Sequence, residues 1–177
     1  MRRIKLVLVA AAAGAALVAT GGCMDNQPAD KTTTSAPAPA LFNPCTSIPD
    51  DALRAAGVDP ATKDSGIAGV HQSGFEICGW RGQQYSITVY SSARTVADYE
   101  SRSDYGDFRD VTIAGRAGRQ FRDKSGGASH LACDVVFPAA QGSIQIELLN
   151  KASADNPPEP CAALNQAAGA LVPHLPK

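Results

Sequence analysis

Cysteine is the residue type in this sequence with the widest range of chemistry, because its thiol can carry a lipid, bind a metal or pair in a disulfide. The chain has five, at Cys23, Cys45, Cys78, Cys133 and Cys161. Cys23 directly follows Gly21 and Gly22, and small residues before a Cys are the pattern at which lipoprotein signal peptides are lipidated and cut. The four remaining cysteines are an even number, which in an oxidising compartment predicts two disulfides.

Motifs for other site chemistry are missing from the sequence. No two cysteines have the C-x2-C spacing, and His71, His130 and His174 are scattered, so we expect no zinc site. The chain has no G-x-S-x-G, S-x-x-K or H-E-x-x-H motif of a hydrolase. Acids are dense from residue 98 to 110, but Arg102 and Arg109 are interleaved with them, which favours a solvated surface over a catalytic pair. We therefore expect no catalytic residue, metal or cofactor, and no enzymatic activity.

The N-terminus has the composition of an export signal. Arg2, Arg3 and Lys5 precede an uncharged, mostly apolar run from Leu6 to Thr20. This run is too short to cross a hydrocarbon core of ~30 Å, which takes about 20 helical residues. The pattern predicts a lipoprotein signal peptide over residues 1–22, lipidation of Cys23 and anchoring on the extracytoplasmic face of the cell membrane, where two or more acyl chains hold a protein firmly.

The rest of the chain divides into a tether and one domain. Residues 23–41 are rich in Pro, Thr and Ala, with no large apolar residue from Asn26 to Ala40, which predicts a disordered tether. Residues 42–177 have the length of a single globular domain. Loss of the three basic residues in 1–22 lowers the net charge from −1 to −4, so a nucleic-acid partner is not expected.

Three helices are predicted in the domain. One follows Pro49, carries acids in its first turn and stops at Gly57. A second, short helix covers residues 95–100 behind an N-cap Thr. The third is amphipathic, begins near Pro160 and ends at Pro173. Its apolar stripe must pack on a sheet.

Strands are predicted from alternating polar and apolar residues. A hairpin joins residues 75–80 to 85–89, and two further pairs join 111–113 to 119–121 and 129–137 to 143–149. Residues 59–74 are predicted to be an exposed loop. The order of elements indicates an α+β fold: a mainly antiparallel, curved sheet of about five or six strands, with helices on one face and two disulfides.

Four cysteines allow three disulfide connectivities. Residues two apart on a strand share a face, so Cys78 lies with Trp80 and Cys133 with Phe137, and both cysteines should point into the core. Cys161 lies on the buried stripe of the last helix. We favour Cys78–Cys133 with Cys45–Cys161, the second of which would join the two ends of the domain.

Several short segments carry a family resemblance. They are Asn43-Pro44-Cys45, Cys78-Gly79-Trp80, Ile113-Ala114-Gly115-Arg116, Cys133-Asp134-Val135 and Pro160-Cys161, in this order behind the lipidation signal. Together they resemble the actinobacterial lipoprotein family of unknown function catalogued as domain of unknown function 3558. The resemblance implies an envelope lipoprotein with two disulfides and no assigned active site.

Two hypotheses for the function follow. The first is a non-catalytic binding module for a small amphipathic or lipid-like envelope molecule, with Trp80, Tyr90, Arg116 and Arg122 as candidate ligand-binding residues. The second is a protein–protein interaction or accessory module that docks onto another envelope component. An envelope lipid, glycolipid or protein is the expected kind of partner. Polar residues at alternate strand positions predict one solvated sheet face, so a cavity would have to lie between helices and sheet. The candidate positions are Ser86, Thr88, Tyr90, Asp134, Gln145 and Glu147. The oligomeric state is not predicted.

Overall fold

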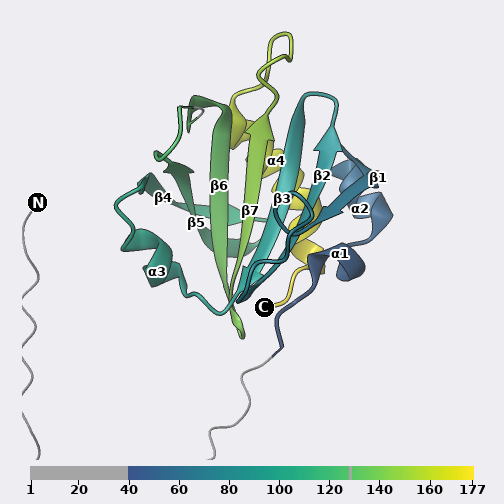
Figure 1. Ribbon diagram of the computed structural model, residues 1–177. Coiled ribbons are helices and arrows are strands. Elements are labelled where there is room, and N and C mark those ends of the chain that lie inside the picture. The colour runs from purple at the N-terminus through teal and green to yellow at the C-terminus, as the bar shows by residue number, and fades with distance from the viewer. Residues whose placement is uncertain (1–39, 128) are drawn as a thin grey trace, which may run out of the picture. The chain divides into compact units, whose positions relative to one another are not determined.

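The protein is built on one antiparallel sheet of seven strands (Figure 1). The structure, a computed structural model, describes residues 40–127 and 129–177. The strands are arranged in the order β1-β2-β3-β7-β6-β5-β4, so the neighbours β3 and β7 are far apart in sequence. The strands are β1 (Val58–Ser65), β2 (Phe75–Gly82), β3 (Tyr85–Ser92), β4 (Tyr105–Ile113), β5 (Arg116–Asp123), β6 (Ala132–Ala139) and β7 (Gly142–Asn150).

The predicted count of five or six strands was too low, and the strand it lacks is β1. This segment was predicted to be part of an exposed loop because its side chains are mostly polar and only Val58 is buried. β1 lies at the edge of the sheet, so it pairs with β2 alone and contributes only Val58 to the core. Thr62 adds a side-chain contact, because its Oγ1 accepts a hydrogen bond of 2.8 Å from the backbone N–H of Arg81 in β2.

Four α-helices accompany the sheet among the described residues. They are α1 (Pro44–Ser47), α2 (Asp50–Ala55), α3 (Val96–Glu100) and α4 (Pro160–Leu171), with 3-10 turns at Ser129–Leu131 and Val172–His174. The three predicted helices are confirmed as α2, α3 and α4. α4 and α2 supply buried residues of the main core, and Cys45 of α1 packs against it. The α3 residue Tyr99 packs with Phe121 and Val136 in a second cluster on the other face, so the prediction that all helices lie on one face was wrong.

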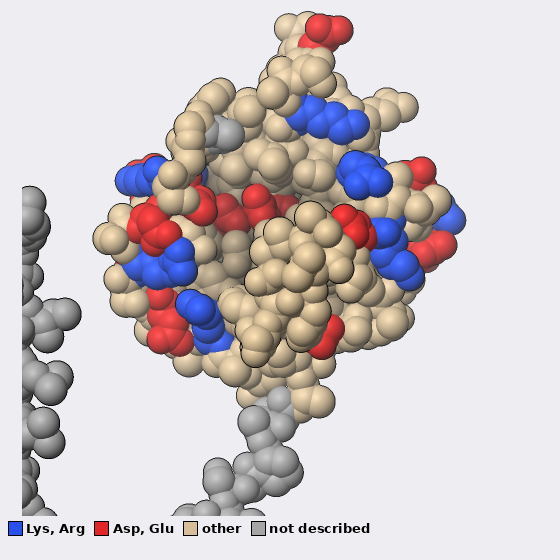
Figure 2. All heavy atoms as spheres, in the orientation of Figure 1, with Lys and Arg blue, Asp and Glu red and all other residues tan. Residues whose placement is uncertain are grey.

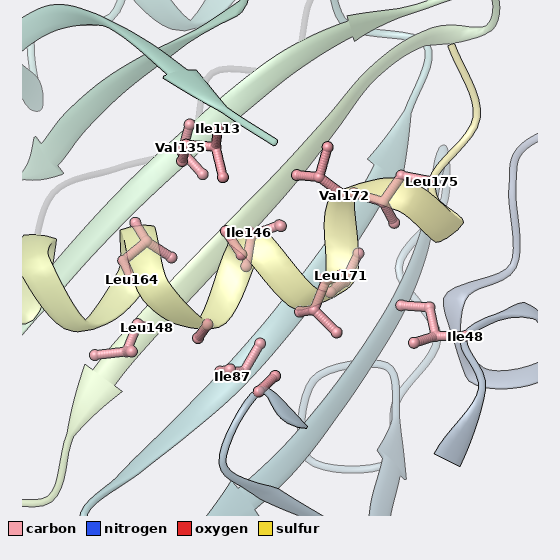
Figure 3. Packing of buried hydrophobic residues seen from close by; sticks show 14 of the residues in the cluster. Ile48, Ile87, Ile113, Val135, Ile146, Leu148, Leu164, Leu171, Val172 and Leu175 are labelled. Carbon is pink, nitrogen blue, oxygen red and sulfur yellow. The ribbon is translucent and has the colours of Figure 1, made fainter. Parts of the chain in front are cut away.

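The main core lies between α4 and the sheet (Figure 3). Leu164 and Leu171 of α4 are completely buried, as are Ile87, Ile146 and Leu148 of the central strands. The spacing of these leucines places them on one side of α4, as the amphipathic pattern predicted. α4 and the central strands β3, β7 and β6 therefore form the packed base of the molecule.

The disulfides join Cys45 to Cys78 and Cys133 to Cys161, with Cα–Cα distances of 5.2 and 5.1 Å. The predicted number is confirmed, but the predicted pairs Cys45–Cys161 and Cys78–Cys133 were wrong. Cys78 and Cys133 are both buried, as expected. However, β3 and β7 separate β2 from β6. Three interstrand spacings amount to about 14 Å, which a disulfide cannot bridge.

Gly57, which ends α2, is held in the left-handed region at φ +80. A Cβ atom there would lie 2.2 Å from the hydroxyl oxygen of Tyr85, which donates a hydrogen bond of 3.0 Å to the backbone oxygen of Ala56. We expect Gly57→Ala to lower the free energy of unfolding by about 2–3 kcal/mol, from the backbone strain and the lost hydrogen bond.

The measurement is urea unfolding of the oxidised protein, with Gly169→Ala as the matched control. A Cβ at Gly169, inside α4, would meet nothing within 4 Å. Because Ala has the higher helix propensity, the control should raise stability by up to about 1 kcal/mol. Equal losses in both variants would refute the role given to Gly57.

Candidate ligand-binding cleft

A hollow opens on the sheet face opposite α4, and acidic atoms lie at its floor (Figure 2). Its volume is about 310 Å³. β3, β6 and β7 form the floor, and α3, the start of β4 and the segment between β1 and β2 contribute the sides. We call this hollow the open-face cleft.

Four polar side chains meet at the floor of the open-face cleft: Tyr90 of β3, Asp134 of β6, and Gln145 and Glu147 of β7. The strand register brings them together, because Asp134 pairs directly with Glu147 and Tyr90 pairs with Gln145. Side chains that are opposite one another on adjacent antiparallel strands have Cβ atoms about 5 Å apart. The four groups therefore form one contiguous polar cluster.

Two hydrogen bonds connect the cluster. The Tyr90 hydroxyl donates to Glu147 Oε2 over 2.6 Å, and the Gln145 amide donates to Asp134 Oδ1 over 2.7 Å. Asp134 is 3% exposed, and this burial, followed by the nearby charge of Glu147, raises the pKa of its carboxyl well above the usual range. Burial and then Glu147 also raise the pKa of the Tyr90 hydroxyl. Burial therefore favours the protonated form of Asp134, which lies next to the Glu147 carboxyl.

Aromatic rings form one side of the open-face cleft. Tyr99 of α3 and Tyr105 of β4 both contact Phe121 of β5, with ring centroids 5.9 and 4.8 Å away. The capping box of Thr95 and Asp98 fixes the start of α3 and so the position of Tyr99. Burial raises the pKa of the Tyr105 hydroxyl to about 12. This side is therefore a packed, uncharged wall.

Two arginines lie at the edge of the open-face cleft, each over an aromatic ring. The guanidinium of Arg94 is 5.3 Å from the centroid of Phe75, and that of Arg102 is 4.4 Å from the centroid of Tyr105. Arg102 is also ion-paired with Asp104. Such stacking holds the cations at the edge rather than at the acidic floor.

A tight turn also borders the open-face cleft. Ile67 and Val70 exchange two backbone hydrogen bonds around Ala68 and Gly69, both of which have positive φ. Ile67 lines the cleft although 54% of it is exposed. The turn therefore presents an apolar side chain at the entrance.

Of the four residues predicted to bind a ligand, the structure places only Tyr90 in the open-face cleft. Trp80 is 1% exposed and packs in the main core. Arg122 donates a hydrogen bond of 2.7 Å to Glu159, the N-cap of α4, and so lies on the other face of the sheet. Arg116 stacks over Phe137 and donates to the backbone oxygen of Pro138. The two arginines therefore make their contacts on the α4 side of the sheet.

The predicted solvated sheet face was wrong. The open-face cleft does lie between a helix and the sheet, but the helix is α3, on the face opposite α4. Asp134 and Gln145, two of the outward polar positions, are only 3% and 8% exposed. α3 and the segment that contains Ile67 cover part of this face. Asp134 carries the sequence signal for this site, because it is an acid inside a strand whose other central residues are apolar.

The buried Asp134 makes stability depend on pH with a definite sign. An aspartate in the unfolded chain has a pKa of about 3.9, so above that pH the unfolded state releases a proton that the folded state keeps. Wild-type stability should therefore fall as the pH rises from about 4 toward the raised pKa of the folded state. Asp134→Asn cannot ionise and still offers an oxygen to Gln145, so it should be more stable than wild type at pH 7.

Urea unfolding of both proteins at pH 7 and pH 4 checks this prediction. The difference should be clear at pH 7 and close to zero at pH 4, because other acids titrate alike in the two proteins. A wild type that is the more stable protein at pH 7 would mean that the folded state holds Asp134 in its charged form.

The described residues offer no alternative centre of metal or thiol chemistry. They contain no group of three or more His, Cys, Asp or Glu side chains placed to hold a metal ion. Their four cysteines are all in disulfides. Cys23, the predicted lipidation site, and the predicted signal peptide and most of the tether lie outside the described residues. No helix in the described part of the chain is long and apolar enough to cross a membrane.

Comparison with known proteins identifies a family. No curated protein and no solved structure matches this chain. A family model described as a protein of unknown function (DUF3558) matches residues 12–174, which is far more than half of the sequence. The protein therefore belongs to the family of domain of unknown function 3558.

Proposed function

We propose that this protein is a lipoprotein of the actinobacterial cell envelope, anchored to the extracytoplasmic face of the cell membrane, that binds a small amphipathic molecule in the open-face cleft without catalysing a reaction. The observation that carries the binding part is the buried polar cluster of Tyr90, Asp134, Gln145 and Glu147 at the floor of a cavity of about 310 Å³. Convergent polar groups in a concave, partly apolar site are typical of ligand pockets.

The anchoring part rests on the N-terminal sequence and on the cysteine pairing. Cys45, Cys78, Cys133 and Cys161 are used in disulfides, so Cys23 has none of them as a partner. Its position behind a charged start and an apolar run fits lipidation. Disulfides also fit an oxidising compartment outside the cytoplasm.

The anchor is tested by Cys23→Ser in an actinobacterium that expresses the full chain. We expect the wild type to fractionate with membranes and to incorporate labelled palmitate, and the variant to do neither. Equal labelling and equal fractionation of the two proteins would contradict the proposal.

The positions of Asp134 and Glu147 favour binding over catalysis. Glycoside cleavage takes two carboxyl groups on either side of the scissile bond, with the substrate between them. Asp134 and Glu147 are cross-strand neighbours that rise side by side from one floor, and Gln145 and Tyr90 already hold one oxygen of each. Such a pair can hold a polar group above it more readily than it can flank a bond.

Thermal unfolding tests the binding function. A ligand that binds only the folded state raises the unfolding midpoint by mass action. The low-molecular-mass fraction of an actinobacterial envelope extract should raise the midpoint of the oxidised wild-type protein. It should not raise that of Glu147→Met, which removes both acceptor oxygens at similar side-chain length. An equal shift in both proteins, or none in the wild type, would overturn the binding proposal.

A further inference from the structure

We infer that the open-face cleft is selective for a ligand with an ammonium group, which binds at the floor to the free oxygen of Glu147 and to the amide oxygen of Gln145. This inference rests on the proposed binding function and specifies the chemical class of the ligand. It is carried by the hydrogen-bonding capacity and the charge that remain at the floor.

The floor has more unused hydrogen-bond acceptors than donors. A tyrosine has one hydroxyl hydrogen, and that of Tyr90 is already donated to Glu147 Oε2. The Gln145 amide directs a hydrogen to Asp134 Oδ1. Among the described residues, no side-chain hydrogen bond uses Glu147 Oε1 or Gln145 Oε1. The proton favoured on Asp134 and the second amide hydrogen of Gln145 are the other donors of the floor. The unused lone pairs of Glu147 Oε1 and Gln145 Oε1 outnumber these hydrogens, and an ammonium group with three hydrogens complements them.

The floor of the cleft carries negative charge, which suits an ammonium ligand. Neither Asp134 nor Glu147 is ion-paired with Lys or Arg within the described ranges, although the structure contains six such pairs elsewhere. The nearby Asp123 adds a further acid to the lining. The arginines of the edge are stacked over Phe75 and Tyr105, and in the described residues neither is ion-paired with a floor acid. A cationic ligand would provide the missing counter-charge for the Glu147 carboxylate.

The walls suit the organic part of such a ligand. Phe75, Ile77 and Tyr105 supply apolar and aromatic surface next to the polar floor. Aromatic faces attract ammonium groups as well as hydrocarbon. The volume of about 310 Å³ is at the small end for ligand pockets, so the fitting molecule is a small amine rather than a lipid with long chains.

Three probes with one skeleton and different charge test the inference: 2-phenylethylamine, 2-phenylethanol and 3-phenylpropanoate. Each is titrated into the oxidised, ¹⁵N-labelled full chain in an uncharged detergent, and backbone amide shifts are followed at Tyr90, Asp134, Gln145 and Glu147. We expect saturable shifts with the amine at concentrations at which the alcohol and the carboxylate produce none.

Two variants make the test specific. Glu147→Gln keeps the shape and an acceptor oxygen but loses the charge, and should weaken binding of the amine about tenfold or more. Asp155→Asn removes the same charge from an exposed loop residue that does not line the open-face cleft, and should bind like wild type. Urea unfolding of each variant verifies that it is folded.

The outcomes separate this inference from the proposed function. Equal shifts at the floor with all three probes would overturn the ammonium selectivity and leave a binding cleft. Shifts with the alcohol or the carboxylate alone would overturn it in favour of a neutral or anionic ligand. No floor shifts with any probe would also overturn it, and the extract experiment above would then decide on binding by itself.

Discussion

Replacement of both Cys133 and Cys161 by Ala should lower the free energy of unfolding of the protein by about 3–4 kcal/mol. The two residues are 28 positions apart, and in the chain-entropy model a closed loop of that length contributes about 3.6 kcal/mol by restricting the unfolded state. Both cysteines are buried in the main core, where the bond fastens the start of α4 to β6. The expected loss is a large share of the 5–15 kcal/mol typical of a domain.

Urea unfolding of the oxidised wild type and the double variant measures this effect. The matched comparison is Cys45→Ala with Cys78→Ala, which opens a loop of 33 residues and should have a similar entropic effect. The Cys45 end is only partly buried, so this pair should lose less packing. A loss below about 1 kcal/mol in the Cys133 and Cys161 variant would contradict the importance given to this bond.

Leu171→Ala should lower the free energy of unfolding by about 3–4 kcal/mol, within the range for a fully buried leucine. Its side chain is completely buried between α4 and the sheet (Figure 3). The change removes three carbon atoms and leaves a cavity that the surrounding side chains can fill only in part. α4 also carries Cys161, so the same face of the helix is held by packing and by a covalent bond.

The control for Leu171→Ala is Gln166→Ala on the exposed side of the same helix. Ala is a slightly better helix former than Gln, so the control should change stability by less than about 0.5 kcal/mol. Both are measured by urea unfolding with the disulfides intact. Similar losses at the two positions would show that α4 does not pack on the sheet by the side described.

Local sequence patterns were sufficient for most of the elements. The Pro49 start and Gly57 stop defined α2, and the apolar spacing defined α4, because caps and periodicity act within a few residues. Six of the seven strands were predicted for the same reason, although only residues 111–113 of β4 were included and residues 129–131 form a 3-10 turn instead of the start of β6. β1 was missed because an edge strand with polar side chains has no alternation to detect.

Long-range features were not accessible to the same reasoning. The disulfide pairing depends on β3 and β7 lying between β2 and β6, and no local pattern encodes that order. The candidate site depends on it as well, since Tyr90 and Gln145 meet only because β3 pairs with β7. Trp80 has a residue type that is common in ligand sites, but its position on β2 directs its side chain into the core. Tyr90 was the one candidate with both the type and the position.

Native mass spectrometry tests the central claim, that the open-face cleft holds a small molecule, most directly. The full chain is extracted from the envelope of an expressing actinobacterium in a mild detergent, and wild type is compared with Glu147→Met. We predict that the wild type carries an adduct of small mass that leaves on denaturation, and that the variant lacks it. A wild type of bare protein mass, or an equal adduct on both proteins, would contradict the claim.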